Sequence, residues 1–268
     1  MQRCLDHATG DGKRIVNAAW QLFFDEISRC EDAGCAVEFW WRDDDAARPD
    51  PALSRLVALA QKMSVPLALA AIPQQSEKET FENIGPFVSI LQHGTDHANR
   101  APPGEKKTEF AASEPPAEAI ARLAAARRQL EMKAGKHFLP VLAPPWNRLP
   151  DHLALQLAAA GLRGLSQYGP RSRVEAAPGL RQVNTHVDII AWRSDRTFVG
   201  ADQALRAATK HLAEKRTAAA DPGEATGWLT HHAVHDEAAW AFLERLFEST
   251  RGIPVLAWRR PEELFNIS

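Results

Sequence analysis

Two short segments of the chain carry residue types that can bind a metal ion. Arg42-Asp43-Asp44-Asp45 directly follows an apolar run, 36–41, and His93-Gly94-Thr95-Asp96-His97 directly follows another. Adjacent carboxylates beside a buried strand repel one another, and a cation relieves that repulsion. Histidines at i and i+4 share a face if their segment turns helically, so they can converge on one ion. An aspartate, two neutral histidines and a water suit a catalytic zinc or a related divalent transition metal.

Each segment also has an ordinary interpretation when it is taken alone. The aspartates fit a solvated loop that ends in a helix N-cap, and the two histidines fit surface or hydrogen-bonded residues. The two segments together favour a metal site, because both lie at the end of an expected strand.

The elements that must position these residues alternate along the chain. Repeated β-then-α order of seven or eight units predicts a parallel sheet closed into a barrel, with ligands at the carboxyl ends of the strands. No internal repeat or linker divides residues 1–268, which favours a single catalytic domain. A proline-rich irregular loop over 99–116 has the length of a functional lid. Strands are expected at 36–41, 67–72, 86–91, 138–142, 164–167, 180–187, 227–230 and 255–258, and helices at 11–29, 51–63, 118–134, 151–160, 202–216 and 236–250.

Composition narrows the class of protein. The chain is 45% hydrophobic and 25% charged with a net charge of -2, which is ordinary for a globular protein with a sizeable core. Its 32 basic residues are scattered, so neither nucleic acid nor a membrane surface is expected as a partner. No apolar stretch reaches the ~20 residues that span a bilayer. Residues 1–7 lack the apolar core of a secretory signal, which predicts a cytoplasmic protein.

Two further segments lie where such a barrel places its chemistry. Pro144 and Pro145 stiffen the chain before Trp146 and Asn147, and the tryptophan can face a sugar ring, form the wall of the site, or pack in the core. His186 and Asp188 share a face if their strand continues, so they either support a site or form a polar strand edge.

A histidine cluster follows the strand expected at 227–230. His231, His232 and His235 lie within five residues of one another. Three such histidines are hard to bury without hydrogen-bond partners, and the alternative is a cluster at the surface. His231 and His232 point to opposite faces of a strand, so only one of them can serve as a catalytic acid.

In this order, the motifs resemble those of the NodB-homology polysaccharide deacetylases, and the Asp-Asp-Asp form is similar to the WalW-like branch. The segment 41–45 corresponds to the family's Thr-Phe-Asp-Asp-Gly, and 93–97 to its His-Ser/Thr-x-x-His. The family's Arg-x-Pro-Tyr is matched by 143–146, its Asp…Trp pair by 188–192, and its Leu-x-His by 229–231. The five matches span residues 39 to 235 in family order.

The resemblance implies a distorted (β/α) barrel of about seven parallel strands and a divalent metal, with zinc expected. It implies hydrolysis of an acetyl group, N-acetyl rather than O-acetyl, on a saccharide substrate. Carried over by position, Asp44, His93 and His97 hold the metal, Asp43 is the general base and His231 the general acid. The residues expected to contact substrate or support the site are Trp146, Asn147, Arg163, His186, Asp188, Trp192 and His232.

The chain departs from the family pattern at the position of Ala143, where an arginine usually orients the catalytic aspartate. A guanidinium suits that task because its planar fork holds a carboxylate at two points. Arg163 is the favoured replacement, with Arg148 next and Arg42 as a further candidate. Asp45 stands where the family has glycine. Two other functions remain open, a metal-dependent amidohydrolase for a non-carbohydrate amide and a catalytically silent relative that binds saccharide or metal.

Overall fold

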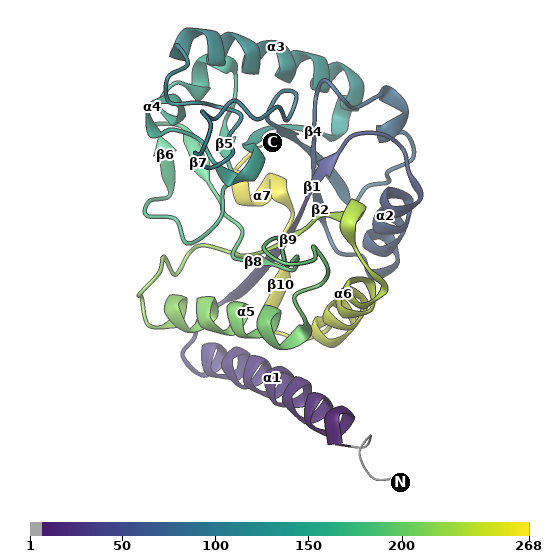
Figure 1. Ribbon diagram of the computed structural model, residues 1–268. Coiled ribbons are helices and arrows are strands. Elements are labelled where there is room, and N and C mark those ends of the chain that lie inside the picture. The colour runs from purple at the N-terminus through teal and green to yellow at the C-terminus, as the bar shows by residue number, and fades with distance from the viewer. Residues whose placement is uncertain (1–6, 268) are drawn as a thin grey trace.

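The structure is a computed structural model that describes residues 7–267, in which helices surround a central sheet (Figure 1). Helix α3 lies at the top of the view, α2 and α6 at the right, and α5 at the bottom with α1 outside it. The strands are β1 (Val37–Ala46), β2 (Leu67–Ala71), β3 (Val88–His93), β4 (Phe138–Ala143), β5 (Gly164–Leu165), β6 (Glu175–Ala177), β7 (Leu180–Gln182), β8 (Val187–Asp188), β9 (Thr226–Thr230) and β10 (Leu256–Trp258). The α-helices are α1 (His7–Asp32), α2 (Pro51–Met63), α3 (Pro116–Ala134), α4 (Asp151–Ala154), α5 (Ala201–Arg216), α6 (Glu237–Thr250) and α7 (Pro261–Phe265), and the short 3-10 helices are η1 (Lys78–Phe81), η2 (Gly135–His137), η3 (Pro145–Asn147), η4 (Leu157–Ala160) and η5 (His232–Val234).

The sheet has the order β6-β7-β5-β4-β3-β2-β1-β9-β8, and β10 pairs with β1. All neighbouring strands are parallel except β6 and β7. The named strands do not form a closed hydrogen-bonded ring among the described residues, but β7 and β8 belong to one segment, 180–188. That segment bonds β5 through Val183 and β9 through His186. The fold is therefore α/β and compatible with the expected distorted (β/α) barrel.

The strand expected at 180–187 is split, because the segment changes neighbours between β7 and β8. The strand expected at 36–41 continues to Ala46, so the aspartates lie within β1 and not after it. The helix expected at 151–160 is two short pieces, α4 and η4. The antiparallel strand β6 was not expected, since its three residues carry no strand-length apolar pattern.

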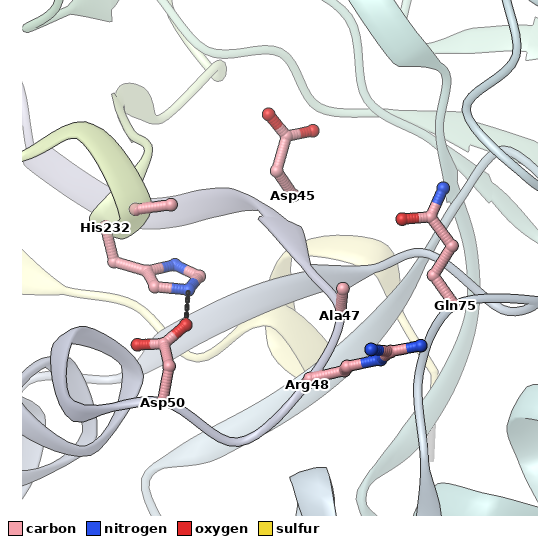
Figure 2. Close-up of a pocket in the computed structure, with 7 residues that line it drawn as sticks. Asp45, Ala47, Arg48, Asp50, Gln75 and His232 are labelled. Carbon is pink, nitrogen blue, oxygen red and sulfur yellow. Dashed lines mark ion pairs between the residues drawn. The ribbon is translucent and has the colours of Figure 1, made fainter.

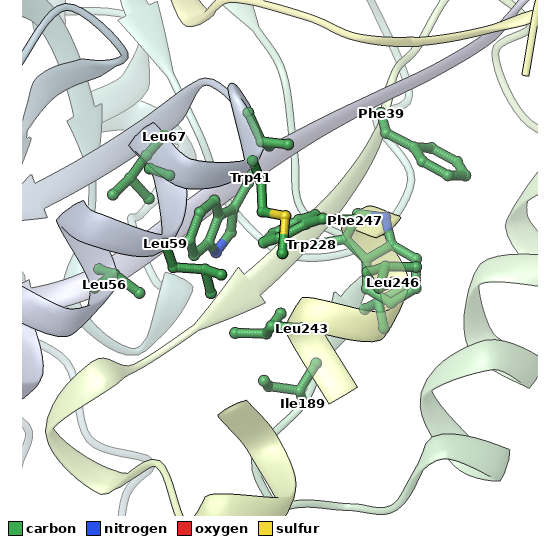
Figure 3. Packing of buried hydrophobic residues seen from close by; sticks show 14 of the residues in the cluster. Phe39, Trp41, Leu56, Leu59, Leu67, Ile189, Trp228, Leu243, Leu246 and Phe247 are labelled. Carbon is green, nitrogen blue, oxygen red and sulfur yellow. The ribbon is translucent and has the colours of Figure 1, made fainter. Parts of the chain in front are cut away.

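Successive side chains of β1 point to opposite faces of the sheet and therefore pack into two different apolar cores. Trp40 faces an inner cluster that includes Val141 of β4 and Phe265 of α7. Trp41 faces an outer cluster between the sheet and its helices, where it meets Phe247 of α6. Figure 3 shows this outer packing around Trp41 and Trp228. Because the aspartates follow these tryptophans on the same strand, the packing fixes the frame from which the carboxylates project.

No helix among residues 7–267 is long and apolar enough to cross a membrane. The expectation of a cytoplasmic protein rested largely on the first residues of the chain, and residues 1–6 lie outside the described part.

Candidate metal centre and active site

The end of β1 bends so that Asp45 leaves the alternation of the strand. The pairing with β2 shifts between Asp43 and Ala46, and Asp45 has a φ of 71°, in the left-handed region. Such a conformation is unfavourable for a residue other than glycine and concentrates at functional sites. The bulge therefore turns the last carboxylate of the run toward the end of β3.

Asp45 meets the two histidines of the 93–97 segment. Its Oδ1 lies 3.0 Å from His93 Nε2 and 3.2 Å from His97 Nε2, yet this buried oxygen has no hydrogen-bond partner in the described chain. Three ligand atoms thus converge without bonding one another, which is the arrangement a bound cation completes.

The structure brings Asp45, and not Asp44, to the histidines. Asp44 instead faces Arg42, two residues earlier on the same side of β1. Arg42 Nη2 donates to Asp44 Oδ2 at 2.9 Å, and Arg42 Nε lies 2.8 Å from Asp44 Oδ1. Arg42 and Asp44 are both buried, so this ion pair holds the carboxylate in one orientation.

The side chain of Arg42 is itself held from three sides. Its Nη1 donates to Ser166 Oγ at 2.6 Å and to the Ser166 carbonyl, and its Nη2 also donates to Asn147 Oδ1 at 2.6 Å. Asn147, which was predicted to contact substrate or support the site, thus bonds Arg42.

The two other candidate arginines contact no carboxylate of the run. The exposed Arg163 donates weakly to Asn266 O, and Arg148 donates to Lys107 O. The favoured choice of Arg163 was wrong in its geometry, because its side chain reaches the C-terminal segment and not the mouth of the barrel.

His93 and His97 converge through a turn that is not helical. His93 is the last residue of β3, and Gly94 and His97 both have positive φ, 61° and 59°. The segment therefore does not turn helically, which was the condition given above for two histidines at i and i+4 to share a face. A Cβ on Gly94 would lie 2.1 Å from Glu109 Oε2 and 2.7 Å from Pro145, so only glycine fits the turn.

Glu109, which sequence reasoning missed, locks this turn. Its buried carboxylate accepts bonds from Thr95 N at 2.8 Å, from Thr95 Oγ1, and from His97 N at 3.1 Å. Glu109 comes from the irregular loop expected at 99–116, where a single acid among polar residues gives no local signal. The loop thus holds the histidine turn in place through Glu109.

His93 has one defined tautomer. Its Nδ1 lies 2.9 Å from the Ala143 carbonyl, and a carbonyl can only accept, so Nδ1 carries the proton. In the neutral ring the lone pair of Nε2 then points toward Asp45 and His97. The Ala143 position, which lacks the family arginine, therefore supports the cluster with its backbone.

Asp43 lies on the other side of β1, away from the histidine pair. Its fully buried carboxylate accepts from Thr230 Oγ1 at 2.6 Å, His232 N at 3.0 Å and His232 Nδ1 at 2.5 Å. Burial raises the pKa of Asp43, but the His232 imidazole outweighs it and the pKa is lowered. This position does not suit the expected role of general base beside Asp45.

His231 follows β9 and faces Trp192. The two rings are 4.6 Å apart in an edge contact, and His231 Nδ1 is buried with no hydrogen-bond partner within residues 7–267. Asp188 accepts from Trp192 Nε1 at 2.8 Å and from Ile190 N, and burial raises its pKa. Asp188 thus supports the tryptophan that covers His231.

Trp146 reaches the opposite side of the cluster. It has a φ of 56° within η3, and its ring lies 4.5 Å from that of His97. Trp192 is 39% exposed, so its indole is accessible as well as bonded to Asp188.

His186 belongs to a different group of side chains. Its Nε2 lies 3.4 Å from Glu224 Oε2, its ring stacks on His211 at 3.5 Å, and its Nδ1 accepts from Gly227 N at 3.0 Å. All three side chains are buried. The structure therefore does not bring His186 to Asp45, His93 and His97.

A pocket of about 470 Å³ opens beside Asp45 (Figure 2). It lies at the loop that joins β1 to α2, the place where a barrel presents its substrate-binding residues. Its lining is Asp45, Ala47, Arg48, Asp50, Gln75, His232 and Ala233.

No protein-family model and no curated protein matches this chain in sequence. Solved structures do match its fold. A Mycobacterium smegmatis protein described as a polysaccharide deacetylase has a TM-score of 0.64 and 15% identity over 87% of this chain and 90% of that chain. The family 4 carbohydrate esterase from Streptomyces lividans, in complex with acetate, has a TM-score of 0.52 and 13% identity over 83% and 92%.

Another similar structure is Puue allantoinase, with a TM-score of 0.59 and 11% identity over 87% of this chain and 89% of that chain. At these identities the similarity shows the fold. The structural neighbours thus include carbohydrate deacetylases and esterases together with an allantoinase.

Proposed function

We propose that this protein is a metal-dependent hydrolase that removes an acetyl group, N-acetyl in preference to O-acetyl, from a saccharide. The observation that carries the proposal is the convergence of Asp45, His93 and His97, in which the buried Asp45 Oδ1 has two imidazole nitrogens at 3.0 and 3.2 Å and no hydrogen bond in the described chain. This assignment gives Asp45 the ligand role that sequence comparison gave to Asp44.

The spacing of the group supports a tetrahedral ion, for which zinc is our choice. With metal-to-nitrogen distances of about 2.0–2.1 Å, tetrahedral ligand atoms lie roughly 3.3 Å apart and imidazole centres roughly 5.2 Å apart. The centres of the His93 and His97 rings are 5.2 Å apart. Such an ion supplies Lewis-acid activation of water and of the acetyl carbonyl.

Asp44 is our candidate for the general base, in place of Asp43. It is the neighbour of Asp45 in the chain, and Arg42 fixes its carboxylate through a buried ion pair. A base must be oriented to accept a proton from the attacking water, and a guanidinium fork supplies that orientation. Arg42 thereby supplies what the family obtains from the position of Ala143.

His231 is our candidate for the general acid. It lies at the end of β9 under Trp192, and its Nδ1 keeps no partner among residues 7–267 that would hold its proton. Histidine is the side chain that most often acts as a general acid, and here it would donate a proton to the departing amine.

Saccharide is the proposed substrate class, and the residues 1–268 are proposed to act as one catalytic domain. The partly exposed Trp192 and the ring of Trp146 beside His97 offer apolar faces against which a sugar ring packs. The run of three aspartates supports the WalW-like branch. Structural neighbours that are named as deacetylases support the reaction, and Puue allantoinase keeps a non-carbohydrate amide as the alternative.

The test is acetate release by the zinc-loaded protein from an N-acetylglucosamine trimer, with allantoin as the competing substrate. We expect acetate from the trimer, loss of activity after chelation and recovery with zinc. His231→Ala should lower turnover by ~10²–10⁴ while zinc stays bound. Hydrolysis of allantoin alone would favour the amide alternative, and zinc binding without turnover of either would indicate a silent relative.

A further inference from the structure

Beside Asp45, a chain of polar side chains leads into the pocket, and the proposed reaction does not use it. It runs from Asp43 through His232 to Asp50, which are contributed by β1, η5 and the loop before α2. Asp43 is buried behind the imidazole, whereas His232 and Asp50 both line the pocket. Figure 2 shows the ring of His232 directed at the carboxylate of Asp50.

One end of this chain is fixed by Asp43. Its carboxylate takes both the backbone N–H of His232, at 3.0 Å, and the ring Nδ1, at 2.5 Å. An ionised carboxylate only accepts, so Nδ1 of His232 carries a proton and the ring is held in this orientation. Nε2 is therefore the atom that the ring presents to the pocket.

The other end is fixed by the helix that follows. Asp50 is the N-cap of α2, and its Oδ1 accepts from Leu53 N at 2.8 Å. Its Oδ2 is left 3.8 Å from His232 Nε2. That distance is too long for a direct hydrogen bond but leaves both atoms accessible to one small polar group.

We propose that His232 Nε2 and Asp50 Oδ2 form a subsite that binds one hydroxyl group of the substrate. A hydroxyl is both donor and acceptor, so it can accept from the imidazole and donate to the carboxylate at the same time. The pocket that holds these two atoms also contains Asp45, which places the bound hydroxyl in the same cavity as the proposed metal centre.

The charges of the pair suit this use. Burial lowers the pKa of His232, but the Asp43 carboxylate outweighs it and the pKa is raised, which favours the charged ring whose Nε2 donates. The inference rests on the proposed function, because it names the polyhydroxylated part of the same substrate. Asp43 is a positioning residue in this scheme, and His232 and Asp50 are the groups that touch substrate.

Asp50→Asn is the direct test. Asparagine caps a helix as well as aspartate, but it places a donor where the hydroxyl must donate. With the N-acetylglucosamine trimer we expect kcat/KM to fall about 10- to 100-fold, mainly through KM, because a hydrogen bond to a charged group is lost. With 4-nitrophenyl acetate, which has no hydroxyl, we expect no change.

Asp236→Asn is the matched control. Asp236 caps α6 through a bond from Ala239 N at 2.7 Å and does not line the pocket. It should leave the ratio of the two kcat/KM values unchanged. An equal loss on both substrates in Asp50→Asn, or no loss on the trimer, overturns the subsite.

Binding separates this inference from the proposed reaction. If the wild-type protein cleaves neither substrate, the reaction is wrong, and the subsite is then tested by calorimetric titration of the zinc-loaded protein with the trimer. A dissociation constant that rises about 10- to 100-fold in both Asp50→Asn and Asp43→Asn supports the subsite. Equal affinity in the variants, or no binding by the wild type, overturns it.

Discussion

Within residues 7–267 there are two clusters of two histidines and one carboxylate whose ligand atoms lie within 4.8 Å of one another. The first is Asp45 with His93 and His97, and the second is His186 with His211 and Glu224. Their residue types are nearly the same, and the difference lies in what the remaining ring nitrogens contact.

In the first cluster His93 donates through Nδ1 to the Ala143 carbonyl, so in the neutral ring Nε2 is unprotonated and can bind a cation. In the second, the backbone N–H of Gly227 donates to Nδ1 of His186. A neutral His186 must then carry its proton on Nε2, where it faces Glu224. A hydrogen on that nitrogen excludes a metal ion.

Ring placement separates the clusters in the same way. The rings of His93 and His97 have centres 5.2 Å apart and an interplanar angle of 34°, as two ligands of one ion require. The rings of His186 and His211 stack at 3.5 Å and 17°. Glu224 is already engaged by the backbone N–H groups of Arg171 and Asn184. Two histidines and a carboxylate therefore make a ligand set only where a backbone carbonyl fixes the tautomer.

The largest expected effect is the loss of bound zinc in His97→Ala. Removing one of three protein ligands should weaken zinc binding by on the order of 10²- to 10³-fold and reduce deacetylation to background. The matched variant in the second cluster, His211→Ala, should keep one zinc per chain. Elemental analysis after dialysis measures both, and zinc lost from His211→Ala but retained in His97→Ala would reverse our assignment.

Asp44→Asn should have the next largest effect. We expect kcat to fall by ~10²–10⁴ with zinc content unchanged, because a general base has been removed without removing a ligand. Glu224→Gln, the corresponding change in the second cluster, should leave kcat per folded molecule within a few-fold. Steady-state kinetics with zinc measured on the same samples tests this, and full activity in Asp44→Asn would exclude it as the base.

Glu109→Gln sharpens the comparison at the histidine turn. One of its carboxylate oxygens becomes an amide N–H that faces the donors of Thr95 or His97, so the turn should loosen. Zinc affinity should fall about 10- to 100-fold, as for other groups that orient metal ligands. Glu114→Gln changes an acid on the same loop that pairs with Arg122 and should not alter zinc affinity. Equal zinc affinity in both variants would show that the contacts of Glu109 do not affect zinc binding.

The smallest effect concerns pH and the second cluster. Burial lowers the pKa of His211 to about 2, and the pKa of His186 is lowered as well, also by burial. Both are neutral in the folded protein, so their stabilising contribution is complete above the unfolded pKa of about 6.5 and is lost as pH falls below it. At pH 5.5 the cost for His211 is about 1.4 kcal/mol, or one pKa unit.

The double variant His211→Phe with Thr226→Val tests this directly. It removes a titrating ring together with the hydroxyl that lies 2.9 Å from His211 Nδ1, so no polar atom of that pair is left without a partner. Urea unfolding at pH 7.5 and 5.5 should show a smaller loss of stability on acidification than in the wild type. An unchanged pH dependence would mean that His211 is not buried neutral. His186, Glu224 and the buried Lys215 remain as neighbouring titratable groups.

Most strands could be predicted from the sequence because strand ends are local features. Apolar runs that stop at charged residues gave most strands within a few residues, and His93 does end β3. The proline-initiated helix 51–63 was predicted at its observed bounds, since Asp50 and Pro51 form a local start signal. The break between β7 and β8 could not be predicted in this way, because their segment changes its partner strand midway.

The pairing of Arg42 with Asp44 had a signal that could have been read. Residues i and i+2 share a face of a strand, so extending the strand past Trp41 would have placed this arginine beside the aspartate. Because the strand was predicted to end at residue 41, that relation was not apparent, and Arg163 was favoured instead. Glu109 had no such signal, because its contacts to Thr95 and His97 cross a loop of 12 to 14 residues.

The sequence by itself determined which residue types could act and at which strand ends they stand, because alternation and capping depend on neighbours in the chain. The tertiary structure decided which of three adjacent aspartates meets the histidine pair and which meets His232. A bulge opposite β2 turns Asp45 toward the histidines, Arg42 retains Asp44, and His232 retains Asp43. That division depends on strand register and on groups that β3, β9 and η5 contribute, and within residues 42–45 only the i, i+2 relation of Arg42 to Asp44 indicates any part of it.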